Sequence, residues 1–256
     1  MASDKDYDYV EVNVRENPYS GDKEVKVVPH KYGEGLWTLI SVTLLFIFIA
    51  LLIQCGAGED KRTYIYDDFS YNLSDDESYF ILLGSNNTVS GDLVIPSEVN
   101  GKPIKVIDEK AFKDCNKMTS VIIPDSVTVI YFNAFQGCDS LKSVVIGNGV
   151  TVIGGRAFEG CDALKSVSIG NSVKYISGSA FKNCNSLVSI NIPNRVTNID
   201  SNAFAGCYRL KNINYNGTVE QWNAIVKDSN WSATTPNIHC TDGTIANDGT
   251  VTYTQN

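Results

Sequence analysis

The sequence predicts an α/β solenoid: a short right-handed stack of about five 23-residue turns with short parallel strands, preceded by one N-terminal transmembrane helix. Three observations lead to this prediction. Five cysteines from Cys115 to Cys207 recur at a constant 23-residue period, and five Ala-Phe pairs keep the same spacing. Residues 36–55 form one uncharged, mostly apolar stretch. The composition, 43% hydrophobic and 20% charged, is that of a folded chain rather than a disordered or polytopic membrane protein.

Residues 1–35 are predicted to be a disordered cytoplasmic tail. They carry eight acidic and five basic residues and few large apolar ones, so they cannot bury enough surface to fold alone. Lys23, Lys26 and Lys31 precede the apolar stretch, whereas Lys61 and Arg62 follow it. This slight excess of positive charge on the N-terminal side favours a cytoplasmic N-terminus.

Residues 36–55 are predicted to be the transmembrane helix. The run LWTLISVTLLFIFIALLI, with the two residues that follow, is long enough to cross a ~30 Å hydrocarbon core at ~1.5 Å per residue. Trp37 lies at the leading edge, where an indole suits the membrane interface. A buried core helix is the other interpretation, but a helix of this length in a soluble protein should show a polar face. The alternatives are a cleaved signal peptide, for which the preceding segment is too long, and a lipoprotein signal ending at Cys55, for which Gln54 is too large.

Residues 93–215 are predicted to form the solenoid, because a single 23-residue turn cannot bury its apolar side alone and copies must stack. Further apolar columns with this period are Met118, Leu141, Leu164, Leu187 and Leu210; Val127, Val150, Val173 and Val196; and Ile107, Ile130, Ile153, Ile176 and Ile199. Within each turn, a period-two run such as 144–146 predicts a short strand. The Ala-Phe-x-x-Cys segment is expected to return along the other side as a helical turn.

The pattern L-x-x-V/I-x-I-P/G-x-x-V-x-x-I-x-x-x-A-F-x-x-C across 93–215 resembles the BspA-type leucine-rich repeat family. The resemblance implies a leucine-rich-repeat solenoid of a kind found on bacterial and protist surfaces. LVIPSEVNGKPIKVI is similar to the usual first repeat of the family, and YNGTVEQWNAIVKDSNW is similar to a common C-terminal end. The adhesins of this family generally carry many more repeats than the five found here.

Both open ends of such a stack need covering. Residues 56–92 are predicted to be a linker and an N-terminal β cap of one or two hairpins. Residues 216–256 are predicted to be a C-terminal cap and tail. In this cap, a short helix over 219–226 would lay Trp222 on the last repeat, and a terminal strand would follow at 251–253.

The five repeat cysteines are expected to be buried free thiols. Neighbours in one ladder lie roughly 5 Å apart and point in parallel, whereas a disulfide needs converging Cβ vectors. Cys240 beside His239 is interpreted as ordinary packing. The chain holds only two histidines and shows no calcium-loop spacing or catalytic motif, so we expect no enzyme activity, no metal and no cofactor.

The outward positions of the strands are predicted to form a ligand-binding face. Five strands at ~4.8 Å spacing would make it about 20–25 Å wide, enough for a peptide, a glycan or one face of a protein. The predicted columns are Ile122, Val145, Ser168, Asn191 and Asn214; Ser143, Ser166 and Ser189; and Lys142, Lys165 and Lys211.

The expected function is that of a membrane-anchored, surface-displayed leucine-rich-repeat binding module. Its partners would be an extracellular protein or glycan, and the lipid bilayer through 36–55, with the repeats outside the cytoplasm. The formal net charge of −8 argues against nucleic acid as a partner. The alternative is a structural or regulatory membrane component, in which the anchor and the tail make the specific contacts and the solenoid is a spacer.

Overall fold

The computed structural model describes residues 9–16, 23–30, 63–66, 69–85 and 89–254. The predicted transmembrane segment 36–55 lies outside these residues. Within the described ranges, no helix combines the length and the apolar character needed to cross a bilayer.

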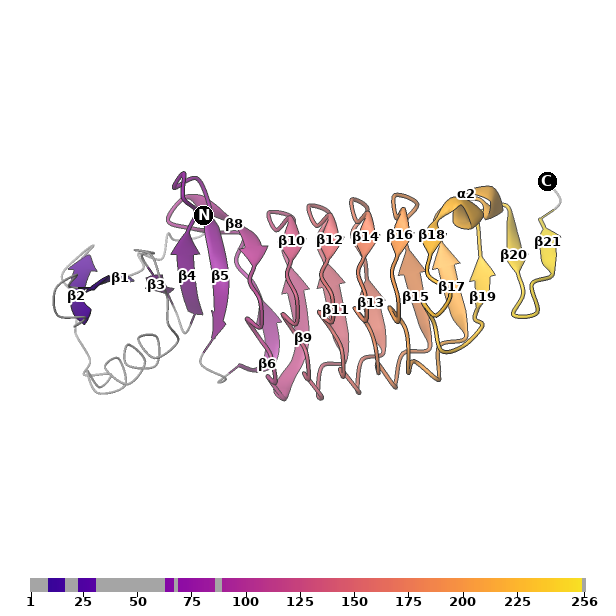
Figure 1. Ribbon diagram of the computed structural model, residues 1–256, viewed down its shortest axis with the longest axis horizontal. Coiled ribbons are helices and arrows are strands. Elements are labelled where there is room, and N and C mark those ends of the chain that lie inside the picture. The colour runs from indigo at the N-terminus through magenta and orange to yellow at the C-terminus, as the bar shows by residue number, and fades with distance from the viewer. Residues whose placement is uncertain (1–8, 17–22, 31–62, 67–68, 86–88, 255–256) are drawn as a thin grey trace, which may run out of the picture.

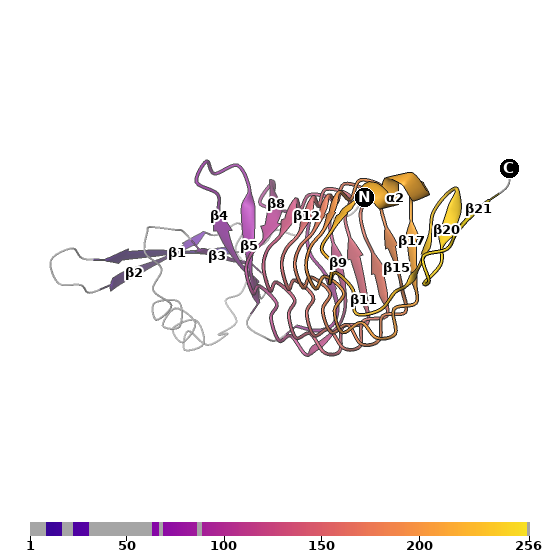
Figure 2. The same cartoon turned by 45° about the vertical axis from the view of Figure 1, so that its right-hand side comes forward.

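The repeats form a parallel β-solenoid with two strand-bearing sides, which we call the front face and the back face (Figures 1 and 2). The front strands are β6 (Ser90–Val94), β9 (Lys117–Ile123), β11 (Ser143–Ile146), β13 (Ser166–Ser168), β15 (Ser189–Ile192), β17 (Asn212–Tyr215) and β19 (Asn237–His239). The back strands are β5 (Phe80–Ser85), β8 (Lys102–Ile107), β10 (Val129–Ile130), β12 (Val152–Ile153), β14 (Tyr175–Ile176), β16 (Asn198–Ile199) and β18 (Val226–Lys227). Neighbouring strands pair in parallel; the front ones form two hydrogen-bonded sheets that adjoin at β13 and β15.

The stack has about seven turns rather than the five predicted. The 23-residue period does not reveal the additional turns, because the number of residues between their paired strands is larger than 23. Leu82 pairs with Ile107, a step of 107 − 82 = 25, and Ile199 pairs with Lys227, a step of 227 − 199 = 28. An end turn stacks against another repeat turn on one side alone, so it can carry extra residues in its loops without disturbing a second ladder of turns.

The α/β prediction is wrong, because the Ala-Phe-x-x-Cys segment is not helical. Each central turn places two residues in the left-handed region, such as Arg156 with φ 57° and Gly160 with φ 74°. A left-handed residue interrupts an α-helix. The Phe135 N–H therefore donates to the Ala157 carbonyl of the next turn at 2.8 Å instead of to its own segment. The structure is a β-solenoid with almost no helix.

An antiparallel extension precedes the solenoid. It comprises β1 (Tyr9–Glu16), β2 (Lys23–His30), β3 (Thr63–Tyr66) and β4 (Phe69–Leu73), and it joins the back sheet at β5. The strands β1 and β2 lie within 1–35, where valines at 10, 12 and 14 alternate with polar residues, a pattern typical of a strand. Val10 pairs with Ile65, so β1 and β3 lie side by side. Near the first turn, β7 (Glu98–Val99) pairs with β8.

The C-terminal end holds the one helix among the described residues, α2 (Val219–Ala224), and an antiparallel hairpin of β20 (Gly243–Ile245) and β21 (Val251–Tyr253). A capping box starts the helix: the Thr218 hydroxyl accepts from the Gln221 N–H, and the Gln221 side chain accepts from the Thr218 N–H. Trp222 is buried with its ring centroid 5.3 Å from that of Tyr215, at the end of the core.

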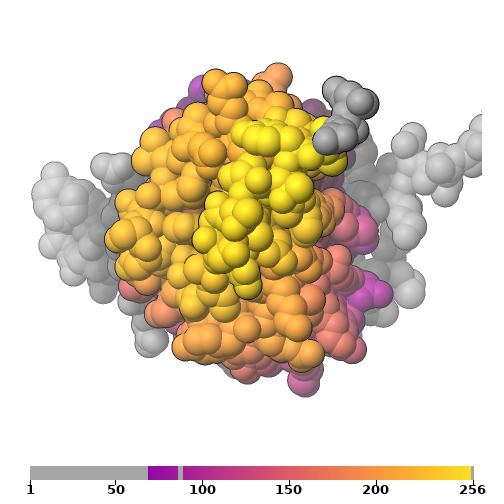
Figure 3. Space-filling model, turned by 90° about the vertical axis from the view of Figure 1, so that its right-hand side faces the viewer, coloured from indigo at the N-terminus to yellow at the C-terminus, as the bar shows by residue number. Residues whose placement is uncertain are grey.

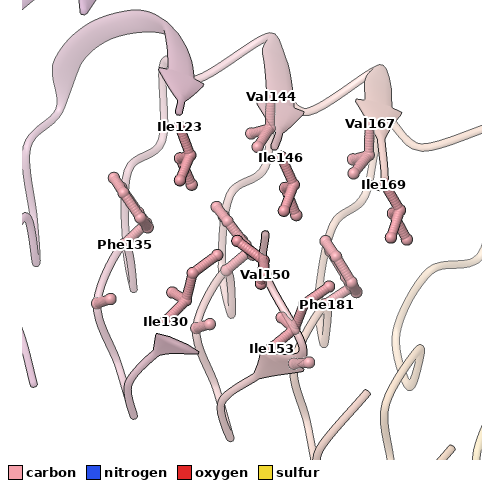
Figure 4. Close-up of a cluster of buried hydrophobic side chains, with 14 of the residues drawn as sticks. Ile123, Ile130, Phe135, Val144, Ile146, Val150, Ile153, Val167, Ile169 and Phe181 are labelled. Atoms are coloured by element: carbon pink, nitrogen blue, oxygen red, sulfur yellow. The ribbon is translucent and has the colours of Figure 1, made fainter. Parts of the chain in front are cut away.

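The interior consists of continuous ladders of identical side chains. Phe112, Phe135, Phe158, Phe181 and Phe204 stack with ring centroids 5.1–5.5 Å apart and interplanar angles of 3–9°. Figure 4 shows phenylalanines of this stack and side chains of the front strands, such as Val144 and Ile146, pointing into the same interior space. Each ring is completely buried, so every turn forms the floor of the next.

We predict that Phe158→Ala lowers the free energy of unfolding by about 3–5 kcal/mol, because it removes a ring that is stacked on both sides and leaves a cavity. Chemical denaturation followed by circular dichroism measures the change. Lys174→Ala, an exposed position in the next turn, is the control and should change the stability by less than about 0.5 kcal/mol. Equal effects of the two substitutions would contradict the stacked core.

Candidate binding surface

The structure places all eleven predicted site residues on the front face or at its leading edge. Alternation along each strand sets this arrangement: in β15, Ile190 and Ile192 point inward and are buried, whereas Ser189 and Asn191 are exposed. Ten of the eleven predicted residues are exposed, and Ser143 is partly buried. The residues brought together are Ile122, Lys142, Ser143, Val145, Lys165, Ser166, Ser168, Ser189, Asn191, Lys211 and Asn214.

One outward column begins with three apolar side chains, Val94, Ile122 and Val145, which we call the apolar stripe. They are paired neighbours on β6, β9 and β11, with exposed fractions of 63%, 43% and 44%. Val94 was missed by the sequence reasoning because the step to its partner Ile122, 122 − 94 = 28, is longer than the period of the repeat. The length of the LVIP unit was the signal that could have found it.

The same column becomes polar toward the C-terminal end. Ser168 follows Val145, and then come Asn191 and Asn214, whose amides are linked by a hydrogen bond of 2.8 Å from Nδ2 to Oδ1. His239 of β19 continues the column, although the sequence reasoning interpreted it as packing. The column therefore changes from apolar to amide-bearing along the axis of the solenoid.

The neighbouring column carries hydroxyls and one fixed carboxylate. Asp92 pairs with Ser120, and its Oδ1 accepts hydrogen bonds from the Ser120 hydroxyl at 2.7 Å and the Thr119 hydroxyl at 2.8 Å. These bonds, that of Ser120 first, lower the pKa of Asp92 below its usual value. Asp92 thus stays ionised beside the apolar stripe. At the other end, His239 Nε2 lies 3.1 Å from Asn212 Oδ1.

The leading edge of the face carries a row of exposed lysines. The backbone N–H of Lys165 donates to the Lys142 carbonyl at 2.9 Å, so the two stand one turn apart. Lys211 follows in the same row after Val188, whose carbonyl accepts from its N–H at 2.9 Å. The front face thus combines an apolar stripe, a hydroxyl and amide surface, and a basic border.

Two other surface features lie away from the front face. On the back-sheet side, Tyr131, Phe132 and Tyr175 are exposed, and the Arg156 guanidinium lies 5.4 Å from the centre of the Phe132 ring. On the side between the sheets, an open hollow of about 550 Å³ is lined by carboxylates, amides, glycines and Lys113. In the part of the chain that the structure describes, no three His, Cys, Asp or Glu side chains are grouped as metal ligands.

The repeat cysteines do not contribute to this surface. They are buried, and each thiol from Cys138 to Cys207 donates to a phenylalanine carbonyl 26 residues earlier, as Cys138 Sγ does to the Phe112 oxygen at 3.1 Å. Burial raises the pKa of Cys115 to about 11 and holds that of Cys184 well above its usual value. All five repeat thiols are free and buried, so they form part of the core, as the ladder geometry predicted.

The stack of equal turns, each with a free outer strand face, has counterparts in a known family. Residues 105–226 match the model of the BspA type leucine rich repeat region in six copies. The match counts six copies, one more than the five turns predicted from the sequence.

Two solved structures are similar to the chain. One is a leucine-rich-repeat protein of T. pallidum, with 27% identity over 68% of this chain and 83% of that protein, and a TM-score of 0.55. The other is a leucine-rich cell surface protein of Faecalibacterium prausnitzii, with 34% identity over 64% of this chain and a TM-score of 0.58. The chain spans 42% of the length of the F. prausnitzii protein. A comparison with curated proteins gives no match.

We predict that the stability falls as the pH rises from about 9 to 11. The pKa of Cys115 is raised from 9.0 to about 11 by burial, so the unfolded chain ionises first and is increasingly favoured across this range. Below pH 9 the contribution of this thiol is constant. The free energy of unfolding should be measured by urea titration at each pH.

Cys115→Ala is the matched variant for this pH dependence. It should be less stable than the wild type at pH 7 but show a shallower fall above pH 9, since a group that ionises on unfolding is removed. Identical slopes for the two proteins would contradict a raised pKa at Cys115.

Proposed function

We propose that the front face of the solenoid binds a protein partner. Leucine-rich-repeat proteins are generally binding modules for proteins, and the BspA-type region makes the same role the natural one here. The observation that carries the proposal is the apolar stripe of Val94, Ile122 and Val145. Protein interfaces commonly have an apolar centre that excludes water and a polar rim that forms hydrogen bonds. The apolar stripe, with polar and charged groups beside it, has this composition.

The arrangement of the polar groups supports the same proposal. Asp92 lies next to the stripe and is fixed by two hydroxyl donors, so it is ready to accept a hydrogen bond or a positive charge from a partner. Lys142 and Lys165 border the stripe on the leading edge and would attract acidic groups at the rim. These groups fix the register of the partner, while the stripe supplies the affinity.

Glycan recognition is the second candidate, and it is favoured by a different surface. The outward columns of the front strands β6 to β17 carry no phenylalanine, tyrosine or tryptophan, whereas Tyr131, Phe132 and Tyr175 are exposed on the back-sheet side. Flat aromatic faces provide large, rigid contact areas with a polar tip. A glycan would therefore be expected at these aromatics and not at the stripe.

We predict that Ile122→Asn combined with Val145→Asn weakens binding of the full-length protein to its partner at least about tenfold, because these substitutions remove the apolar centre of the interface. A protein array and a glycan array probed with the full-length chain supply the partner, and surface plasmon resonance measures the affinity. The strand positions are already exposed, so the thermal stability should change little.

Val226→Asn is the control, because Val226 is an apolar strand residue of the back sheet that is more exposed than Ile122 and Val145. It should leave the affinity unchanged. Loss of binding in the control alone, or in a Tyr131→Ala Tyr175→Ala variant alone, would refute the front-face proposal and favour the back-sheet side.

We also propose that residues 36–55 anchor the chain in a membrane, with the N-terminus in the cytoplasm and the repeats outside. The support is the uncharged run in the sequence and the description of the F. prausnitzii protein as a cell surface protein. This topology places 9–16 and 63–66 on opposite sides of the bilayer, so it requires the pairing of β1 with β3 to be open in the membrane-bound protein.

Single cysteines at Asn13 and Thr63 test this topology in a Cys55→Ser Cys240→Ser background. On intact cells, a membrane-impermeant maleimide should label Thr63→Cys and spare Asn13→Cys; after cell lysis it should label both. Equal labelling of the two positions on intact cells would show that both lie on one side and would remove the anchor from the proposal.

The structural or regulatory alternative predicts different effects of the same variants. If the solenoid were only a spacer, the Ile122→Asn Val145→Asn variant would keep full function, whereas deletion of residues 2–30 would abolish it. The front-face proposal requires the opposite pattern.

A further inference from the structure

The front face does not end in a closed edge. After β19, the chain forms the β20–β21 hairpin, and β21 is the last strand of its sheet. All three residues of β21 are exposed, and Figure 3 shows the hairpin region lying uncovered across the C-terminal end of the molecule. Every residue of β21 pairs with β20, which leaves the outer side of the strand without a neighbour among the described residues.

The hydrogen bonds show which backbone groups face outward. Ala246 N–H donates to the Thr250 carbonyl at 2.8 Å, and Thr254 N–H donates to the Asp242 carbonyl at 3.0 Å. In an antiparallel pair, successive residues direct their backbone groups to opposite sides. Thr250, Thr252 and Thr254 therefore face β20, whereas the N–H and C=O groups of Val251 and Tyr253 face outward.

The side chains of these two residues continue the apolar interior beyond the solenoid. Ile213, Ile238, Ile245 and Val251 are successive paired neighbours of one inward column. Ile213 is completely buried, whereas Val251 is 39% exposed. Tyr253, at 63%, points to the same side as Val251. The inward side of the hairpin is thus apolar and only partly covered.

The C-terminal edge of the back sheet is protected against pairing with another strand, whereas the edge at β21 is not. The back sheet ends at β18, where the Lys227 ammonium donates to the carbonyls of Trp222 at 2.6 Å and Ile225 at 2.9 Å. A lysine at an edge strand blocks the approach of another strand. Residues 250–254, Thr-Val-Thr-Tyr-Thr, contain no charge, no proline and no glycine.

We propose that β21 pairs with β21 of a second copy of this chain, antiparallel and about a two-fold axis at Thr252. In this register Val251 lies opposite Tyr253 of the second copy, and the outward N–H and C=O groups of each satisfy those of the other. The two apolar pairs cover each other on the inward side, and Thr250 lies opposite Thr254 with no like charges juxtaposed. The strand is thus complementary to itself, which is the requirement for a two-fold interface.

The contact is small and therefore weak. A pairing of five residues on each side falls well below the ~1,200 Å² buried in a stable interface, so the two copies exchange rapidly. Attachment of both copies to one surface would raise their effective concentration and populate the pair. Two front faces would then extend from one continuous sheet and present two binding surfaces together.

Disulfide trapping tests the register directly. Directly opposed residues of a non-hydrogen-bonded antiparallel pair have Cα atoms ~4.5 Å apart, within the range that a disulfide accepts. Thr252→Cys occupies this position on the axis. Thr250→Cys, equally exposed, would be four residues from its own copy, ~14 Å along the strand, and too far to bridge.

The experiment uses the full chain with Cys55→Ser and Cys240→Ser, oxidised mildly at several protein concentrations and examined by non-reducing electrophoresis and intact mass. Thr252→Cys should give at least about tenfold more covalent dimer than Thr250→Cys, since it alone meets the distance limit. Equal yields from the two variants, or none from Thr252→Cys, would overturn the proposal.

A second variant separates edge pairing from an effect on the fold. Tyr253→Pro in the Thr252→Cys chain removes an outward N–H but leaves the bonds to β20 intact, since proline is tolerated where the missing N–H faces away from the partner strand. It should abolish the covalent dimer without changing the thermal unfolding of the solenoid. Undiminished cross-linking in this variant would show that the edge does not pair through its backbone.

Discussion

The structure depends on one constraint, the hydrogen-bonded step from each turn to the next. Phe135 N–H donates to Ala157, and Phe158 N–H donates to Ala180, both at 2.8 Å, so the backbone sets the spacing of every column at once. The phenylalanine rings, 5.1–5.5 Å apart, stack at nearly the same interval. A single inserted residue would move all columns out of register. The central turns therefore keep one constant length, and longer steps occur at the ends, where a turn stacks against one other repeat turn rather than two.

The sequence was sufficient wherever local alternation decided the structure. Val144 and Ile146 are buried and Val145 is exposed, as a period of two requires, and this alone placed the predicted site residues on one face. The sequence was insufficient where residues other than glycine adopt a left-handed backbone conformation, because their side chains do not indicate it. Arg156 and Ser179 adopt left-handed φ angles near 60° although neither is glycine, so the segment was predicted to be a helical turn. The ladder bonds to both neighbouring turns hold these residues in place, and such bonds join residues far apart in the chain.

The candidate surface was incomplete for a related reason. Asp92, Val94 and His239 belong to the front columns through pairing steps that are longer than the period that revealed the others. The interior tolerates little variation, because each ring or methyl group meets an identical neighbour, whereas exposed strand positions can change at almost no cost in stability. The gradient from Val94 to Asn214 is therefore not imposed by the fold. The proposed contact with a partner protein would account for the three adjacent apolar side chains on this surface.

The ends of the solenoid show how an open stack handles its unpaired strands. At the N-terminal end, antiparallel strands continue the back sheet through β4 and β5. At the other end, Lys227 belongs to the last back strand, and its ammonium donates to the carbonyls of Trp222 and Ile225 at the end of α2. The β20–β21 hairpin acts differently on the front sheet, because adding two strands moves the free edge outward without removing it. Whether this free edge can pair with another strand then depends on its composition. The strand β21 has no charge and no proline and carries apolar side chains on its inward side, so its edge can still pair with another strand.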